Sequence, residues 1–248
     1  MSSRSDENLE VNLVLQAIFR KYGYDFRNYS PAHVKRRLLG KLTENELDHL
    51  SELIPRIIYD QAFFDSLLID LTVNVTEMFR DPKFFLALRE TVFPKLAILP
   101  FIRVWLAGCA SGEEAYSLAI SLDESGLYDQ CQIYATDLDE LVLKKAANGI
   151  FDLGKMRKYT RNYQHAGGQK AFSDYYVANY DAARIGGRIK KNIFFSRHNL
   201  VSDASFNEMN LIFCRNVLIY FNQELQDHII TLFHDSMPQG GFLCLGPK

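Results

Sequence analysis

The sequence has few cysteines, no long apolar run and no strong excess of either charge. Its four cysteines, Cys109, Cys131, Cys214 and Cys244, stand far apart without metal-ligand spacing, so we interpret them as reduced residues of a cytoplasmic protein. No apolar run approaches the ~18 residues of a membrane span, and the polar start MSSRSDENLE does not resemble a signal peptide. The net charge of −2 argues against a general nucleic-acid binder.

The sequence also lacks the residue groupings of two common site types. Its six histidines are scattered, and no Ser/His/Asp or Cys/His pairing suggests a nucleophilic enzyme. The glycine-containing segment at 108–114 lacks the Lys and Ser/Thr of a phosphate-binding Walker A loop.

Residues 1–75 are predicted to form a helical N-terminal domain. Apolar residues recur at helical spacing from Leu9 to Ile18, and Ser30-Pro31 is a typical helix start. Two further helices are expected near residues 44–59 and 61–71. The stretch from Arg20 to Lys41 carries seven Lys and Arg against one acid, Asp25. Within it, His33, Arg37 and Lys41 are four residues apart and share one helix face.

The pattern changes after a second helix start, Asp81-Pro82. Strands are predicted at 102–107, 132–135, 193–196, 211–214 and 242–245, with helices at 113–122, 138–148 and 223–236. This alternation indicates an α/β domain with a mostly parallel, doubly wound sheet. Residues 151–192, rich in Tyr, Gly and basic residues, break the rhythm. We interpret them as an inserted antiparallel β-subdomain, with small strands near 175–180 and 185–190.

Candidate ligand-binding residues follow the predicted strands, where open α/β sheets bind their ligands. Gly108 and Gly112 permit a tight turn and close backbone approach, although they can equally serve only a strand-to-helix turn. The acids that follow, Glu113 and Glu114, suit a ligand with hydroxyls or positive charge. After the second strand come Asp137 and Asp139, and an acid at this position can bind ribose hydroxyls. Either acid can instead serve only as a helix N-cap, which is the favoured interpretation for Asp139.

The next two strands end in His198-Asn199-Leu200 and in Arg215-Asn216-Val217-Leu218-Ile219-Tyr220. Asn199 and Leu200 can hold the edge and face of an adenine, or Asn199 can instead cap a turn. Arg215 can contribute to the reacting centre or pair with a surface acid. Together, the strand ends indicate an adenosine-like ligand.

Five ordered motifs run along nearly the whole chain. They are NVTEMFRDP (74–82), LAGCASGEEAYSLAI (106–120), ATDLD (135–139), HNL with FCRNVLIYF (198–200 and 213–221), and MPQGGFLCLG (237–246). In this order they resemble the CheR-type enzymes, the chemotaxis receptor protein-glutamate O-methyltransferases. The sequence departs from the family pattern at Met78, Ala115 and the terminal LGPK.

The resemblance implies a class I methyltransferase dependent on S-adenosylmethionine (SAM), with a helical N-terminal domain (1–75) and a SAM-binding domain (76–248). It places Asn74, Thr76 and Arg80 at the methionine end of SAM and Glu114, with Glu113 beside it, near its amino group. Gly108 is also expected to bind the cofactor. It assigns Asp137 to the ribose and Asn199 and Leu200 to the adenine. Arg80, Arg215, Asn216 and Tyr220 are expected at the reacting end, with Arg80, Arg215 and Tyr220 as catalytic candidates.

The expected reaction methylates glutamate carboxylates of a chemoreceptor and yields S-adenosylhomocysteine (SAH). Because a free glutamate has a pKa near 4.3, it is ionised at neutral pH and needs no strong base. His33, Arg37 and Lys41 are predicted to contact the acidic substrate helix, the alternative being a solvated helix face. The β-subdomain can dock a receptor tail by strand addition or can serve only as a stabilising insertion. We expect a monomer that enters no membrane and binds no nucleic acid. The alternative is a SAM- or SAH-binding signalling module with little turnover.

Overall fold

The structure is a computed structural model that describes residues 4–72 and 76–246. The chain divides into two compact units, residues 1–73 with 217–230, and residues 74–216 with 231–248. The sequence predicted a division near residue 75 and placed all of 76–248 in one domain. In the structure, residues 217–230 instead belong to the helical unit.

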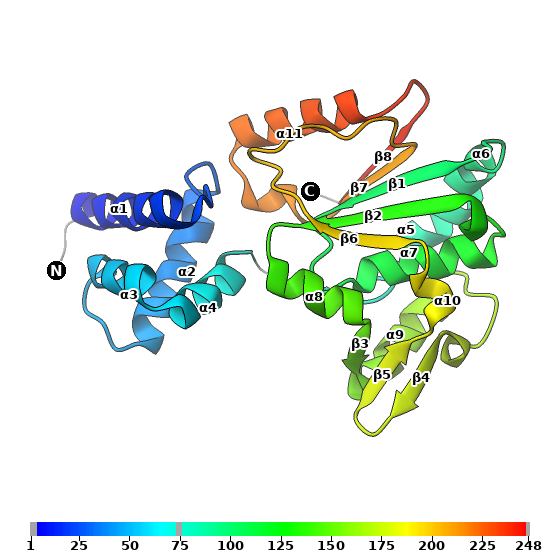
Figure 1. The fold of residues 1–248 in the computed structure, drawn as a ribbon, viewed down its shortest axis with the longest axis horizontal. Coiled ribbons are helices and arrows are strands. Elements are labelled where there is room, and N and C mark those ends of the chain that lie inside the picture. The colour runs from blue at the N-terminus through cyan, green and yellow to red at the C-terminus, as the bar shows by residue number, and fades with distance from the viewer. Residues whose placement is uncertain (1–3, 73–75, 247–248) are drawn as a thin grey trace. The chain divides into compact units, whose positions relative to one another are not determined.

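Helices form most of the first unit (Figure 1). They are α1 (Arg4–Tyr22), α2 (Pro31–Glu44), α3 (Leu53–Tyr59) and α4 (Gln61–Thr72). The helix predicted for 44–59 is shorter than expected, because only a 3-10 turn (Leu50–Glu52) precedes α3. Val14 and Ile18 are buried, as the helical spacing of apolar residues predicted, but Leu9 and Leu13 of the same pattern are exposed. Leu38 and Ile57 are also buried in this unit.

Residues 217–230 pair with the segment that leads into α2. Tyr29 and Phe221 form an isolated antiparallel bridge. The Ser30 N–H donates to the Tyr220 carbonyl at 2.7 Å, and the Ser30 side chain makes no capping bond. The sequence therefore located the start of α2 correctly, but the start is held by this non-local pairing rather than by a side-chain cap.

A five-stranded parallel sheet forms the centre of the second unit, in the order β6-β2-β1-β7-β8. Its strands are β1 (Ile102–Ala107), β2 (Cys131–Asp137), β6 (Ile193–Arg197), β7 (Leu211–Cys214) and β8 (Phe242–Leu245). The parallel α/β prediction is confirmed. The chain builds outward from β1 to β2 and β6, then crosses to β7. The order therefore reverses between β1 and β7, where ligands bind in such sheets.

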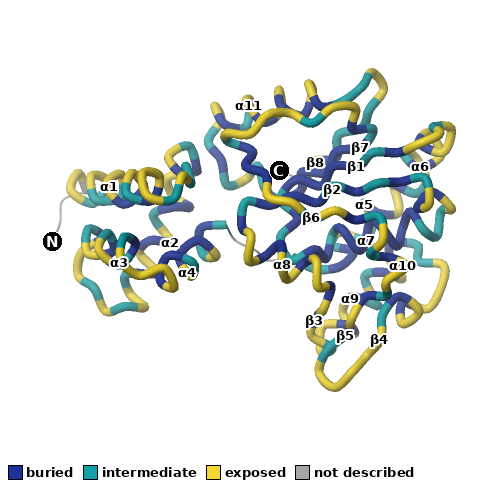
Figure 2. Tube along the Cα trace, viewed as in Figure 1, coloured by how far each residue is buried: buried dark blue, intermediate teal, exposed yellow. Residues whose placement is uncertain are grey.

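Helices cover both faces of this sheet. On one face lie α7 (Glu113–Glu124) and α8 (Glu140–Asn148), against which Val104 and Leu106 of β1 pack (Figure 1). On the other face Trp105 packs edge-on against Phe233 of α11 (Gln223–Ser236). As a result, the central strands β1, β2 and β7 are buried along most of their length (Figure 2).

The inserted subdomain contains a three-stranded antiparallel sheet in the order β3-β5-β4. Its elements are β3 (Ile150–Asp152), α9 (Leu153–His165), β4 (Tyr176–Asn179), β5 (Ala182–Ile185) and α10 (Gly187–Lys190). An antiparallel insertion was predicted correctly, but the strand expected at 185–190 was wrong. Gly186 and Gly187 end the strand, and a short helix follows. The sequence analysis also missed α9.

The remaining helices of the second unit precede the sheet. They are α5 (Pro82–Ala87) and α6 (Phe93–Leu96), joined by a π-helical turn (Leu88–Val92). Among the helices of residues 4–72 and 76–246, no helix is both long and apolar enough to cross a bilayer.

Candidate active site

The loop after β1 needs glycine at two positions. Gly108 and Gly112 have φ angles of 75° and 91°, which disfavour side chains. A Cβ on Gly112 would lie 3.0 Å from the Ala146 Cβ, so α7 and α8 approach each other closely here. The Gly108 N–H donates to the Thr136 carbonyl at 2.8 Å, which joins the loop to β2. The prediction of a tight turn is therefore confirmed. The close contact seen here is with α8, and the predicted close approach to a ligand stays a prediction.

Asp137 ends β2 and joins the loops that follow β1 and β2. Its carboxylate accepts the Ala110 N–H at 2.8 Å and the Asp139 N–H at 3.2 Å. Burial raises its pKa, although the N–H group of Ala110 works in the opposite direction. Each carboxylate oxygen keeps acceptor capacity beyond its one backbone bond. Asp139 is the N-cap of α8, as predicted, and accepts from the N–H groups of Leu141 and Val142.

Glu113 begins α7 with its side chain buried. Its carboxylate accepts the Ser111 hydroxyl at 2.6 Å and lies 3.4 Å from the Tyr159 hydroxyl of α9. Burial raises the pKa of Glu113, partly offset by the Ser111 hydrogen bond and by the positive charge of Lys155. A buried acid in this state gains from a cationic ligand group brought beside it.

Arg215 lies at the point where the strand order reverses, and it joins the ends of β7, β1 and the segment before α5. Its Nη1 is 2.5 Å from Glu114 Oε1, and its Nη2 is 2.6 Å from Asp81 Oδ2. Nη1 also donates to the Arg80 carbonyl at 3.3 Å. Only 2% of the Arg215 side chain is exposed, and its guanidinium stacks over the Phe84 ring. This guanidinium therefore has a structural role, because it connects Glu114 of α7 to the Arg80–Asp81 segment.

Asp81 and Pro82 begin α5 as predicted, with Asp81 as the N-cap residue and Pro82 at the first helical position. The Asp81 backbone is left-handed (φ 57°), and its side chain makes no capping bond but pairs with Arg215. A left-handed aspartate is strained and persists where surrounding contacts fix it. Here the Arg215 contacts to Arg80 and Asp81 fix the turn from which the Arg80 side chain projects.

Arg80 and Arg215 therefore differ in what they can do. Both residues are catalytic candidates from the sequence, and either guanidinium could bind and orient a substrate carboxylate. The Arg215 guanidinium, however, already binds the carboxylates of Asp81 and Glu114. Arg80 is half-buried and makes no side-chain hydrogen bond or ion pair with any residue that the structure describes. It remains the candidate for contacting substrate. Thr76 is also half-buried, and Asn74 lies outside the described residues.

Two side chains that the sequence analysis missed hold residues 78 and 79 in place. The Phe79 N–H donates to the Ser117 hydroxyl of α7 at 2.8 Å, and Asn162 of α9 donates to the Met78 carbonyl at 3.0 Å. Ser117 stands in the segment that resembles the family's glycine motif, so that motif was a usable signal. No local pattern marks Asn162.

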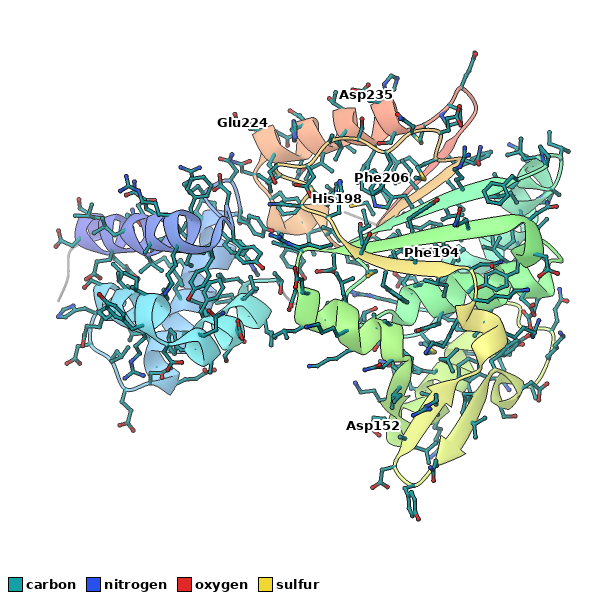
Figure 3. The ribbon with its side chains drawn as sticks, viewed as in Figure 1. Asp152, Phe194, His198, Phe206, Glu224 and Asp235 are labelled. Carbon is teal, nitrogen blue, oxygen red and sulfur yellow. The ribbon has the colours of Figure 1, made fainter. Side chains whose placement is uncertain are left out.

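The loop after β6 is built on His198, Asn199 and Leu200, all three buried. The His198 N–H donates to the Asp137 carbonyl at 3.1 Å, which ties this loop to the acid at the end of β2. The Asn199 Oδ1 accepts the Val201 N–H at 3.0 Å, so Asn199 does cap a turn. Contact of its amide group with an adenine edge stays a prediction. Figure 3 shows His198 and Phe206 on the side of the sheet that carries α11.

Asn216 and Tyr220 follow β7 in sequence but belong to different units. Asn216 has a left-handed backbone (φ 59°), and a Cβ on Gly246 would come within 3.0 Å of its nitrogen. Tyr220 belongs to the helical unit, where its ring lies 4.8 Å from the His33 ring.

His33, Arg37 and Lys41 do not form one exposed basic face, so that interpretation of α2 is wrong. His33 is buried, with its Nε2 3.1 Å from the Leu71 carbonyl. Lys41 is also buried, and its Nζ binds Ser66, Asp70 and Glu44 at 2.8–3.0 Å. The two side chains face α4 and neighbouring groups of their own unit. Arg37 is half-buried, and substrate contact stays a prediction for it alone.

The second unit is a nucleoside-binding α/β domain of the kind used by SAM-dependent methyltransferases. Its reversal of strand order, glycine loop and acid after β2 define that class. The buried acids Glu113 and Asp137 fit a ligand that carries a positive charge and ribose hydroxyls, and no lysine stands in this loop to favour a phosphate.

Comparison with known proteins identifies the family. Residues 74–248 match the SAM-binding domain of CheR methyltransferases, and residues 9–72 match the all-alpha domain of CheR methyltransferases. The chain belongs to the CheR methyltransferase family, and SAM is its cofactor.

Three relatives illustrate the relationship. A Pseudomonas putida protein named as methyltransferase Cher3 is 46% identical over 248 residues, which cover 100% of this chain and 91% of that protein. The chemotaxis protein methyltransferase of Listeria monocytogenes is 31% identical, with 93% of this chain and 86% of that protein covered. Chemotaxis protein methyltransferase 1 of Pseudomonas aeruginosa is 33% identical, with 84% and 78% covered.

Proposed function

We propose that this protein transfers the methyl group of SAM to glutamate side-chain carboxylates of a chemoreceptor or related signalling protein. The observation that carries the proposal is the family membership, since relatives at 31% and 33% identity are named chemotaxis protein methyltransferases. The proposal includes a cytoplasmic, monomeric enzyme whose partner is the receptor.

The proposed reaction needs no general acid or base. SAM supplies a methyl group on a positively charged sulfur. A carboxylate oxygen of the substrate forms a bond to the methyl carbon while the carbon–sulfur bond breaks, giving a methyl ester and SAH. The glutamate is already ionised at neutral pH, so no proton has to move. The absence of a nucleophile–base pair in the sequence agrees with this reaction.

The residues of this chain contribute by binding and orientation. Asp137 and Asn199 hold the nucleoside, and Glu113 and Glu114 provide negative charge for its cationic end. Arg80 orients the incoming carboxylate with paired N–H donors. Because the carboxylate loses its charge as the ester forms, a moderate hold is better than a tight one. Well-oriented reactants can contribute roughly 7–11 kcal/mol to lowering the barrier.

The test uses tritiated-methyl SAM and purified cytoplasmic fragments of methyl-accepting chemoreceptors. We expect base-labile label in wild-type fragments and none in fragments whose methylation-site glutamates are changed to alanine. Arg80→Ala should lower kcat by a larger factor than it weakens the affinity for SAH, measured by calorimetry. SAH binding without transfer to any fragment would instead favour a signalling module with little turnover.

Docking of a receptor tail remains a prediction for the subdomain. Its β4 strand lies at the edge of the three-stranded sheet, and Val177 and Tyr180 are 69% and 93% exposed. An edge strand of this kind can accept an added strand. A pull-down with receptor tail peptides checks this separately from methyl transfer.

A further inference from the structure

The inserted subdomain carries a charge that the chain as a whole does not. Residues 151–192 hold nine Lys and Arg against three Asp and no Glu. The rest of the chain holds nineteen Lys and Arg against twenty-seven Asp and Glu. A basic patch is therefore set into an otherwise acidic protein.

Several of the subdomain's basic residues have partners within the protein. Arg188 pairs with Asp123, Lys191 with Asp129, and Lys158 with Glu77. Arg157 and Arg161 of α9 are exposed and have no ion pair or hydrogen bond with the residues described by the structure. We call the exposed side chains of Lys155, Arg157, Lys158 and Arg161 the α9 basic face.

The α9 basic face is unfavourable for the helix itself. Met156, Tyr159 and Tyr163 form the buried side of α9, and no acidic residue occurs among its thirteen positions. Arg157 and Arg161 are four residues apart, a spacing at which like charges destabilise a helix. Lys155 stands in the first turn, where the helix dipole favours acids. Packing therefore does not explain these charges, and a binding partner would.

The same helix borders the candidate active site. Tyr159 and Lys155 approach Glu113, and Asn162 binds the Met78 carbonyl. Lys158 pairs with Glu77. The α9 basic face is therefore adjacent to residues 77 and 78, which precede Arg80 in the chain and belong to the same unit.

We propose that the α9 basic face docks the acidic, glutamate-bearing helical segment of the methyl-accepting partner and presents it to the adjacent site. The inference rests on the proposed function and names the surface that selects its substrate. Charge complementarity identifies this occupant, because a segment that offers several glutamates for methylation is itself acidic. A long polyanion such as nucleic acid fits less well, since the acidic remainder of the chain repels it.

Binding of a labelled helical peptide tests the surface without catalysis. One peptide carries glutamates along one face, and its partner carries glutamine at the same positions. We expect the glutamate peptide to bind at least about tenfold more tightly, with affinity that falls as salt rises. Arg157→Glu with Arg161→Glu should remove that preference. Lys144→Glu with Lys145→Glu, an equal charge change on exposed positions of α8, should leave it intact.

Methyl transfer separates this inference from the proposed function. The Arg157→Glu, Arg161→Glu variant should lower kcat/KM for the receptor fragment about tenfold, mainly through KM, with SAH affinity unchanged. If wild type labels no fragment, the proposed function fails. If wild type labels the fragment and this variant matches it, the inference alone fails.

Two further outcomes would overturn the docking surface. An equal loss in the α8 variant would mean general electrostatic steering. Equal binding of a single-stranded oligonucleotide of matched charge would mean an unspecific polyanion surface. The milder Arg157→Gln, Arg161→Gln variant provides the same comparison should charge reversal prevent folding.

Discussion

Replacing Arg215 with methionine should destabilise the second unit strongly. The side chains involved are 2% exposed for Arg215, 15% for Glu114 and 51% for Asp81. A half-exposed partner contributes about 1 kcal/mol or less. Leaving the nearly buried Glu114 carboxylate without its partner costs more, about 3–5 kcal/mol. Most of the predicted loss therefore comes from Glu114, and Arg215→Met should lower the free energy of unfolding by that larger amount.

A double-mutant cycle isolates this interaction. Because Glu114→Gln removes the buried charge, the combined variant Arg215→Met, Glu114→Gln should cost clearly less than the sum of the two single changes. Asp81→Asn is the matched control at the exposed end of the network and should cost about 1 kcal/mol or less. Urea unfolding followed by circular dichroism gives the four free energies of unfolding.

The pH dependence of Arg215→Met follows from the same contacts. Burial raises the pKa of Glu114, and the positive charge of Arg215 opposes this. Without Arg215 the folded-state pKa should rise further above the unfolded value near 4.5. The native state then binds more protons than the unfolded state, so the variant should lose stability, relative to wild type, as pH rises through that interval. An Arg215→Met cost below about 1 kcal/mol, or strict additivity, would refute the reasoning.

Three other changes have distinct expected results. Asp137→Ala should weaken SAH binding about 10- to 100-fold in calorimetry, because a charged hydrogen bond is lost; unchanged affinity would remove Asp137 from the ribose site. Glu124→Gln should cost about 3–5 kcal/mol in urea unfolding, since it leaves the Arg89 guanidinium buried without its carboxylate partner. Burial alone raises the pKa of Glu124, but hydrogen bonds from Tyr163, Tyr175 and others lower it overall. Wild type should therefore lose stability as pH falls below about 4.5, more steeply than Glu124→Gln. Lys41→Met should destabilise the helical unit by about 1–3 kcal/mol and leave the KM for receptor unchanged; a raised KM at full stability would restore Lys41 as a substrate contact.

The parallel sheet and the loops at its strand ends could be predicted from sequence because their signals are local. Residues 102–107 are apolar except for Arg103 and show no alternation, as strands covered on both faces do. Glycines and acids follow the first two strands directly, and His198-Asn199 and Arg215-Asn216 follow the next two. The helix from Gln223 to Ser236 could also be predicted, from its amphipathic spacing.

The errors came from partners distant in sequence. Asp81-Pro82 has the local form of an N-cap and first helical residue, but Arg215, 134 positions away, binds the carboxylate. Helical spacing put His33 and Lys41 on one face, but it could not show that α4 covers that face. In α9 the buried tyrosines alternate with basic residues, which concealed the helical period. Near Gly186 the apolar and basic residues suggested a continuing strand, although the Gly186-Gly187 pair is a local signal for its end.

The participation of residues 217–230 in the helical unit affects how the protein can be dissected. A fragment limited to residues 9–72, the region matching the all-alpha domain, would lose the Tyr29–Phe221 bridge and the Ser30–Tyr220 hydrogen bond. A cut at the unit boundary would instead divide α11, because its residues up to Ile230 group with the N-terminal helices and those from Thr231 with the sheet. The two halves of the gene are thus not interchangeable modules, and swapping N-terminal domains between relatives requires exchanging the 217–230 segment as well.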